Sequence, residues 1–186
     1  QGYYGLPAES AEVLTPERTL HTGDMGYLDA DGYLVISGRL KEQYKLENGR
    51  YVVPSPLEAE LRASRFIRNV MVTGDGRPYN IALIVPEHEP LRAWAEAQRI
   101  QVLEHAALLQ HPEVRALLAR ELEACSNGFR QFEKVRDFLL LEDDFTVEEG
   151  TLTHTLKLKR REITERYAEQ IDTLYGVHRG ARRAID

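Results

Sequence analysis

The segment from His21 to Gly49, HTGDMGYLDADGYLVISGRLKEQYKLENG, determines how the rest of the chain is organised. Within it, the run Asp29-Ala30-Asp31-Gly32 separates two stretches rich in aromatic and aliphatic residues, Met25–Leu28 and Tyr33–Ile36. Such stretches favour β-strands, and glycine adopts the positive φ that tight turns require. The pattern therefore predicts a β-hairpin.

Charged residues flank this hairpin. Asp24 precedes its first strand, and Arg39 and Lys41 follow its second strand. Because a hairpin returns the chain to its start, Arg39 should lie beside Asp24. An ionised aspartate can accept hydrogen bonds from two ribose hydroxyls, and a guanidinium can donate to a ribose oxygen or a phosphate. An isolated Thr-Gly-Asp is only a turn in most proteins, but the ordered spacing of these motifs favours a nucleotide site.

Farther along, the pattern predicts a second hairpin and then a mixed domain. The hairpin pairs Gln43–Leu46 with Tyr51–Val53. Ser55 has the spacing of a helix N-cap, with Glu58 three residues later as the second half of a capping box. The later periodicities predict helices near 57–64, 87–97 and 100–127, a last helix that starts near 156–159 and runs to 175, and strands near 66–72, 81–85 and 138–141. We expect Gly176 to end the last helix.

These elements indicate an α+β fold, with a small central sheet flanked by helices and preceded by β-hairpins. The best boundary in the chain is near Arg39–Lys41, where the first hairpin ends. The chain contains 186 residues, 42% of them hydrophobic, which is enough for a real core. Because it does not begin with Met, we interpret it as a fragment or a processed form of a longer protein.

Composition restricts the function classes. The net charge of −6 argues against nucleic acid as the main partner. Cys125 is the only cysteine, so an internal disulfide is excluded and a reducing, cytoplasmic location fits. The six histidines are not spaced as zinc ligands, so we expect no metal site built by this chain. No apolar run is long enough to span a bilayer.

Several motifs resemble the adenylate-forming enzymes, and within them the C-terminal part of long-chain fatty acyl-CoA synthetases. The ordered series T-G-D, G-Y-L-D-x-D-G-Y-L and G-R-x-K-E occupies residues 22–42. The segment VTGDGRPY at residues 72–79 is similar to another stretch of those enzymes. Residues 152–160, LTHTLKLKR, resemble their L-T-P-T-L-K-L-K-R motif, with His154 in place of proline.

The resemblance implies a role for each marked residue. Residues 1–40 would be the end of the large AMP-binding domain, and residues 41–186 the small C-terminal domain. Lys157 would be the catalytic lysine, and Lys41 the hinge about which the small domain turns. The nucleotide would contact Asp24 and Arg39. The loop from Lys45 to Gly49 would face the active site after the turn and line the path of the CoA thiol.

The implied reaction joins a fatty acid to CoA through an acyl-adenylate. ATP, AMP, CoA and Mg²⁺ are the implied cofactors, with Mg²⁺ held mostly outside this chain, and the missing N-terminal domain is the implied partner. Such a fragment should not be active alone. Two alternatives remain open: a fatty acyl-AMP ligase that acts on a carrier protein, and a non-catalytic docking or dimerisation module. Whether the intact enzyme forms a homodimer or associates peripherally with a membrane also remains open.

Overall fold

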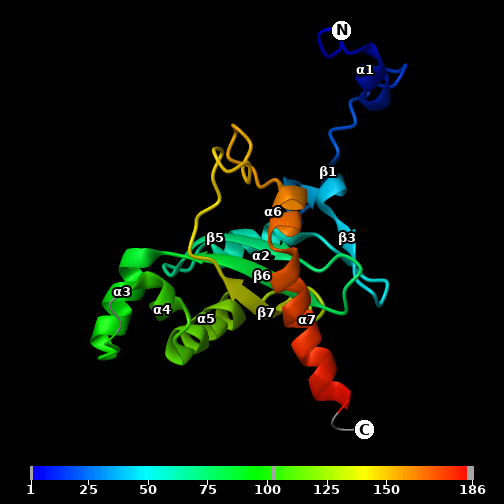
Figure 1. Cartoon of the computed structure of the whole chain (residues 1–186). Helices are drawn as coiled ribbons and strands as arrows, with labels where there is room; N and C mark the ends of the chain where they lie inside the picture. The colour runs from blue at the N-terminus through cyan, green and yellow to red at the C-terminus, as the bar shows by residue number, and fades with distance from the viewer. Residues whose placement is uncertain (1, 102–103, 184–186) are drawn as a thin grey trace.

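The computed structural model describes residues 2–101 and 104–183 and shows an α+β fold, as the sequence predicts (Figure 1). The helices are α1 (Pro7–Val13), α2 (Pro54–Leu61), α3 (His88–Ala97), α4 (His105–Leu109), α5 (Pro112–Cys125), α6 (Arg160–Arg166) and α7 (Ala168–Arg183). The strands are β1 (Asp24–Leu28), β2 (Leu34–Arg39), β3 (Tyr44–Lys45), β4 (Tyr51–Val52), β5 (Ile67–Thr73), β6 (Asn80–Pro86) and β7 (Val135–Leu140).

The centre of the domain is a three-stranded sheet with the order β5-β6-β7. β5 and β6 are antiparallel, whereas β6 and β7 are parallel. A parallel pair needs a long crossover, and α3, α4 and α5 form the described parts of that connection. Every residue of β6 is buried, as expected of a central strand covered on both faces. β5 is therefore one edge of the sheet.

Side chains of the sheet alternate between two hydrophobic clusters, because successive residues of a strand point to opposite faces. One face, which includes Val72 and Ile84, packs against α2, α3, α4 and α5. The other face, which includes Met71 and Leu83, packs against Ile163 of α6 and against α7. Figure 1 shows α7 crossing the sheet on the side opposite α5. The helices thus cover both faces and leave the edge of β5 to be satisfied by other groups.

Both predicted hairpins are present. β1 and β2 pair in antiparallel fashion, and β3 pairs with β4. The first hairpin and α1 extend away from the central sheet (Figure 1). The outer residues of this hairpin are exposed, including Tyr27, Tyr33 and Leu34. Within the described residues, no helix combines the length and apolar character needed to cross a membrane.

The predicted capping box at the start of α2 is wrong. The helix begins at Pro54, so Ser55 lies inside its first turn, and the N-cap residue Val53 has no side-chain cap. Proline suits the first turn because its fixed φ is helical and its missing N–H would be unpaired there. Ser55 instead donates a hydrogen bond to Glu42, at 2.6 Å. Glu58 is buried and has partners outside its own helix.

The last helix also differs from the prediction at both ends. Leu156 has a φ of +58°, which an α-helix cannot contain, so α6 begins only at Arg160. A break at Tyr167 then separates α6 from α7. Gly176 does not end the helix, because α7 continues to Arg183. A glycine inside a helix costs only about 1 kcal/mol, which neighbouring interactions can outweigh.

Replacing Leu83 with alanine should lower the free energy of unfolding by about 2–5 kcal/mol, because a buried leucine loses contacts and leaves a cavity. Leu83 is 0% exposed in the central strand. Leu34→Ala is the matched control, since Leu34 is 66% exposed, and it should change stability by less than about 0.5 kcal/mol. Urea denaturation of both variants measures the difference; equal losses would contradict the assignment of the core.

Candidate functional site

The first hairpin brings Asp24 and Arg39 together. The two residues face each other across β1 and β2, and the carboxylate and guanidinium form an ion pair at 3.1 Å. The Arg39 side chain is 54% exposed, and a pair in that setting contributes at most about 1 kcal/mol to stability. The backbone N–H of Leu40 donates to the carbonyl of Gly23 and closes the hairpin. The pair is therefore held in place by the backbone, with its outer side open to a ligand.

Lys41 lies in a single 3-10 turn, Leu40–Glu42, between this hairpin and the rest of the chain. Its side chain is exposed. The next residue, Glu42, is partly buried and accepts the hydrogen bond from Ser55. The chain is thus anchored on both sides of Lys41, by the closed hairpin before it and by Glu42 after it.

Lys45 is the last residue of β3, and Gly49 lies in the loop that joins β3 to β4. The carbonyl of Lys45 accepts a hydrogen bond from Gly76, and Glu47 donates one to the carbonyl of Arg77. These bonds dock the loop on the β5–β6 turn. Gly49 has a φ of +83°, a conformation that favours glycine. The ammonium of Lys45 lies 5.8 Å from the centre of the Tyr51 ring.

Lys157 is exposed at the end of a tight turn that precedes α6. The N–H of Thr153 donates to the Lys157 carbonyl at 2.8 Å, and the N–H of Lys157 donates to the Thr153 hydroxyl at 3.1 Å. A bridge between Leu152 and Leu158 extends this pairing. The left-handed Leu156 turns the chain between them. Lys157 therefore belongs to a pinned loop and not to a helix.

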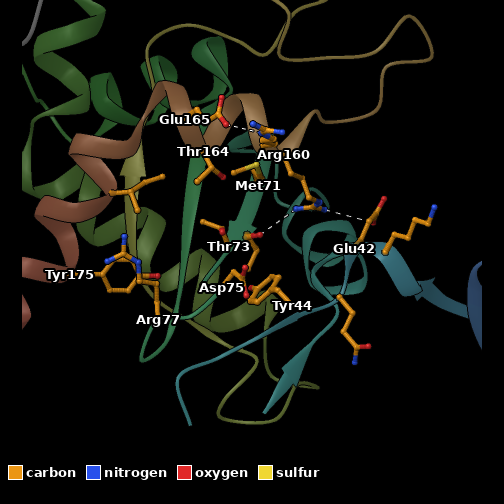
Figure 2. Close-up of a pocket in the computed structure, with 16 residues that line it drawn as sticks. Glu42, Tyr44, Met71, Thr73, Asp75, Arg77, Arg160, Thr164, Glu165 and Tyr175 are labelled. Carbon is orange, nitrogen blue, oxygen red and sulfur yellow. Dashed lines mark hydrogen bonds and ion pairs between the residues drawn. The ribbon is translucent and has the colours of Figure 1, made fainter. Parts of the chain in front are cut away.

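A pocket of about 510 Å³ lies between the 3-10 turn Leu40–Glu42, β5 and the last two helices. Its walls include Lys41, Tyr44, Asp75, Arg160 and Tyr175. Figure 2 shows Arg160 reaching from α6 across this pocket toward Glu42. Of the residues predicted for the site, the pocket contains Lys41 but not Lys157, Asp24 or Arg39. The structure thus places the predicted residues in four separate groups: Asp24 with Arg39, Lys41 at the pocket, Lys45 with Gly49 in the second hairpin, and Lys157 on its own loop.

Sequence reasoning missed the central interaction of this pocket. The guanidinium of Arg160 donates to both carboxylate oxygens of Glu58, at 2.7 and 2.6 Å. Glu58 also accepts the N–H of Val72 at 2.7 Å, and Arg160 donates to the Val72 carbonyl at 3.3 Å. The pair thereby satisfies both backbone groups of an edge-strand residue. A glutamate between Leu57 and Leu61, on the apolar side of a helix, was the available signal for a buried charge that needs a partner.

Burial and charge act on this cluster in opposite directions. Burial alone would lower the pKa of Arg160, but its hydrogen bond to Glu58 and the charges of Glu58 and Glu42 outweigh burial and raise that pKa. Burial raises the pKa of the Tyr44 hydroxyl, and the charge of Glu58 adds to the effect. The Tyr44 hydroxyl donates a hydrogen bond to Asn80 Oδ1, at 2.8 Å. Arg160 is therefore charged and Tyr44 neutral at any physiological pH.

A second pocket of about 420 Å³ lies beside the Lys45–Gly49 loop and is strongly basic. It is lined by Arg50, Arg130, Lys134 and Arg136, among others. The guanidinium of Arg50 lies 4.8 Å from the centre of the Phe132 ring. Clustered cations next to aromatic rings suit a ligand that carries both phosphate and a flat base. In the part of the chain that the structure describes, no group of three or more His, Cys, Asp or Glu residues could hold a metal ion.

Comparison with known families gives the identity of this domain. The family model of the AMP-binding enzyme C-terminal domain matches residues 41–179. This chain belongs to the AMP-binding enzyme family. The match includes Lys157 and the Lys45–Gly49 loop and begins at Lys41, the residue between the two anchored segments.

Two curated relatives are named long-chain-fatty-acid–CoA ligases. One, from Mycobacterium tuberculosis, is 32% identical over 94% of this chain and 29% of its own length. Another, long-chain-fatty-acid–CoA ligase 1 of Homo sapiens, is 33% identical over 94% of this chain and 25% of its own length. The chain therefore spans between a quarter and a third of the length of these relatives.

Solved structures of the same family share the fold. The adenylation domain of a carboxylate reductase from Mycobacterium chelonae matches 94% of this chain with a TM-score of 0.76 at 30% identity. The corresponding domain from Segniliparus rugosus, solved with AMP and a co-purified carboxylic acid, matches equally well, with a TM-score of 0.76. This chain covers 26% of each of those chains.

Glu58→Ala should be among the most destabilising single changes in this domain. It leaves the partly buried Arg160 and the N–H of Val72 without their partner, which should cost about 3–5 kcal/mol. The control is Glu60→Ala, two residues along the same helix and exposed, which should cost less than about 0.5 kcal/mol. Chemical denaturation measures both; a loss below about 1 kcal/mol for Glu58→Ala would mean that the pair is not an essential contact.

Proposed function

We propose that this chain is the C-terminal part of an ATP-dependent fatty acid–CoA ligase. Residues 1–40 would complete the large AMP-binding domain, and residues 41–186 would form the small domain that turns against it. The observation that carries the proposal is the exposed Lys157 on its pinned loop, in a domain of the AMP-binding family. The curated relatives named above support the choice of substrate class.

In the first step, the carboxylate of a fatty acid attacks the α-phosphorus of ATP. An acyl-adenylate forms and pyrophosphate leaves. Negative charge increases on the oxygens between the two reactants, and a fixed ammonium there lowers the barrier. Lys157 supplies that ammonium. Asp24 would accept hydrogen bonds from the ribose hydroxyls, while Arg39 holds the Asp24 carboxylate and can donate to a ribose or phosphate oxygen.

In the second step, the CoA thiol attacks the acyl carbon and AMP leaves. The small domain would turn about Lys41, which withdraws Lys157 and presents the Lys45–Gly49 loop. Hinges of this kind work through the φ and ψ of very few residues. The anchored segments before and after Lys41 support this place for the pivot.

The basic pocket beside the Lys45–Gly49 loop supports a phosphate-bearing acceptor. Arg50, Arg130, Lys134 and Arg136 would hold the phosphates of CoA, and Phe132 would offer a flat surface to its adenine. Mg²⁺ would accompany ATP and be held by the phosphates and by residues of the missing domain. The reaction would take place in the cytoplasm.

A second candidate function is acyl transfer to a carrier protein in place of free CoA. The observation that favours it is the structural match to carboxylic acid reductase. An adenylation and carrier-protein didomain of that enzyme from Segniliparus rugosus covers 98% of this chain with a TM-score of 0.71. The chemistry of the first step is the same in both cases. The two candidates differ only in the molecule that carries the thiol.

Lys157→Ala in the intact ligase should lower the rate of acyl-adenylate formation by at least about 100-fold, because an aligned charge is lost from the transition state. Thioester formation from supplied acyl-adenylate and free CoA should remain within about twofold of wild type, because Lys157 is withdrawn in that step. Pyrophosphate release measures the first step, and mass spectrometry of acyl-CoA measures the second.

Lys159→Ala is the control, since Lys159 lies two residues away and pairs with Glu162 at 3.8 Å. It should leave both steps near wild type. Equal losses in both steps for Lys157→Ala would remove it from the first-step role. If supplied adenylate gives no thioester with free CoA but does acylate a carrier protein, the second candidate function is correct.

Lys41→Pro in the intact ligase should slow thioester formation more than adenylate formation, because proline fixes φ near −65° and removes the freedom that a pivot needs. Lys41→Ala keeps that freedom and removes only the side chain, so both of its half-reactions should stay close to wild type. Single-turnover rates of the two half-reactions make the comparison. Wild-type rates in both steps for Lys41→Pro would place the pivot elsewhere.

A further inference from the structure

Arg160 occupies a position between the two moving parts of the proposed mechanism. It is the first residue of α6 and follows Lys157 by three residues. Between them, Lys159 donates its N–H to the carbonyl of Thr151 at 2.9 Å and closes the base of the Lys157 loop. The backbone of Arg160 therefore continues directly from the base of the loop that carries Lys157.

The side chain of Arg160 fastens this point to the centre of the domain. Its bidentate contact with Glu58 joins α6 to α2, which lie 102 residues apart in sequence. Its contact with the Val72 carbonyl joins both to the edge of β5. The Glu58 side chain is only 5% exposed. A planar guanidinium held by two parallel hydrogen bonds has a fixed direction as well as a fixed position.

The same guanidinium also reaches the hinge turn. A terminal nitrogen of Arg160 lies 4.0 Å from a carboxylate oxygen of Glu42. A dashed line marks this contact in Figure 2. Glu42 follows Lys41 directly, and the same carboxylate oxygen accepts a hydrogen bond from the Ser55 hydroxyl at 2.6 Å. Ser55 in turn lies on α2, the helix that carries Glu58. Two routes, through Arg160 and through Ser55, thus tie Glu42 to one rigid group of residues.

Stability alone does not account for this arrangement. Removing two charges from water costs several kcal/mol per ion, and well-packed apolar residues are often at least as stabilising as a buried ion pair. An apolar pair could not bind the backbone of Val72 and could not attract Glu42. The network therefore fixes the orientation of the Arg160 side chain and connects it to Val72 and Glu42, which an apolar pair could not do.

We propose that Arg160 is a positioning residue that couples the Lys157 loop to the hinge turn. Through Glu58 and Glu42 it makes the catalytic lysine and the first residue after the pivot parts of one rigid body. When the domain rotates at Lys41, Lys157 then moves with it by the same rotation, because no flexible segment separates the two. This inference rests on the proposed function, since it assigns no substrate contact to Arg160 and acts only through Lys157.

Arg160→Lys in the intact ligase tests the coupling. Lysine keeps the positive charge but cannot form the bidentate contact and reach Glu42 at the same time. We expect kcat for adenylate formation to fall about tenfold, with the KM for ATP unchanged, because a small misplacement of Lys157 removes transition-state contacts and not ground-state binding. Thioester formation from supplied acyl-adenylate should stay within about twofold of wild type.

Two further variants exclude a general effect on folding. Arg161→Lys makes the same substitution at the next residue of the same helix, where Arg161 pairs with Glu165 of that helix at 2.8 Å, and should leave both half-reactions unchanged. Glu42→Gln keeps an acceptor for Ser55 but removes the attraction to Arg160. It should slow adenylate formation about threefold, a size typical of one partly exposed ion pair. Combined with Arg160→Lys, it should add no further loss, because both changes break one connection.

Equal losses in both half-reactions for Arg160→Lys, in step with a lower unfolding temperature, would reduce Arg160 to a structural contact and overturn the inference. Additive losses in the double variant would also overturn it. If Arg160→Lys does not fold, Glu42→Gln decides, since unchanged adenylate formation in that variant contradicts the coupling. Lys157→Ala, measured in parallel, separates the two claims. A selective first-step loss there, without one in Arg160→Lys, overturns only the inference; equal loss of both steps in Lys157→Ala overturns the proposed function itself.

Discussion

The ion pair between Glu58 and Arg160 is the contact that joins the separate layers of this domain. α2 packs on one face of the sheet and α6 on the other, so their side chains do not meet through the sheet. They meet around its edge, where the pair also satisfies the N–H and carbonyl of Val72. An edge strand that would otherwise present unpaired groups is closed in this way. The contact thus joins α2, the edge of β5 and the first residue of α6, which directly follows the Lys157 loop.

In the proposed mechanism, the small domain carries two separate chemical surfaces in fixed relation to one pivot, Lys41. Lys157 stands on a loop pinned by its own backbone, and the Lys45–Gly49 loop is docked on the β5–β6 turn. Neither loop depends on the other for its shape. A turn at Lys41 can therefore exchange one surface for the other without rebuilding either. Asp24 and Arg39 lie on the opposite side of the pivot, in the hairpin that we assign to the large domain.

Local patterns predicted most of the secondary structure, because alternation and turn residues carry that information directly. The two hairpins, β5, β6, β7 and the α+β class all follow from them. The pairing of Asp24 with Arg39 followed from the geometry of a hairpin. The Thr-Leu-Lys motif marked Lys157 as the catalytic lysine, which stays a prediction. The left-handed conformation of its neighbour Leu156 could not be predicted from residue propensities. Whether the assigned roles of these residues are right stays a prediction.

What the sequence could not provide was the long-range contact. The spacing of Ser55 and Glu58 fits a capping box. Both side chains instead bind residues that are distant in sequence, which a local pattern cannot predict. Arg160 looked like one of several cations in a basic run. Its special role comes only from the packing of α6 beside α2 and β5. The prediction from local sequence patterns thus differed most from the structure at the buried charged residues.

The most direct test exchanges the ion pair for an apolar one. In the intact ligase, Glu58→Leu combined with Arg160→Met removes both buried charges together. The unfolding free energy of this double variant should lie within about 2 kcal/mol of wild type and well above that of either single variant, since neither charge is left alone. Adenylate formation should nevertheless remain slow, because Lys157 is no longer tied to the turn that contains Lys41. Recovery of adenylate formation together with stability would show that the pair holds the fold and nothing more.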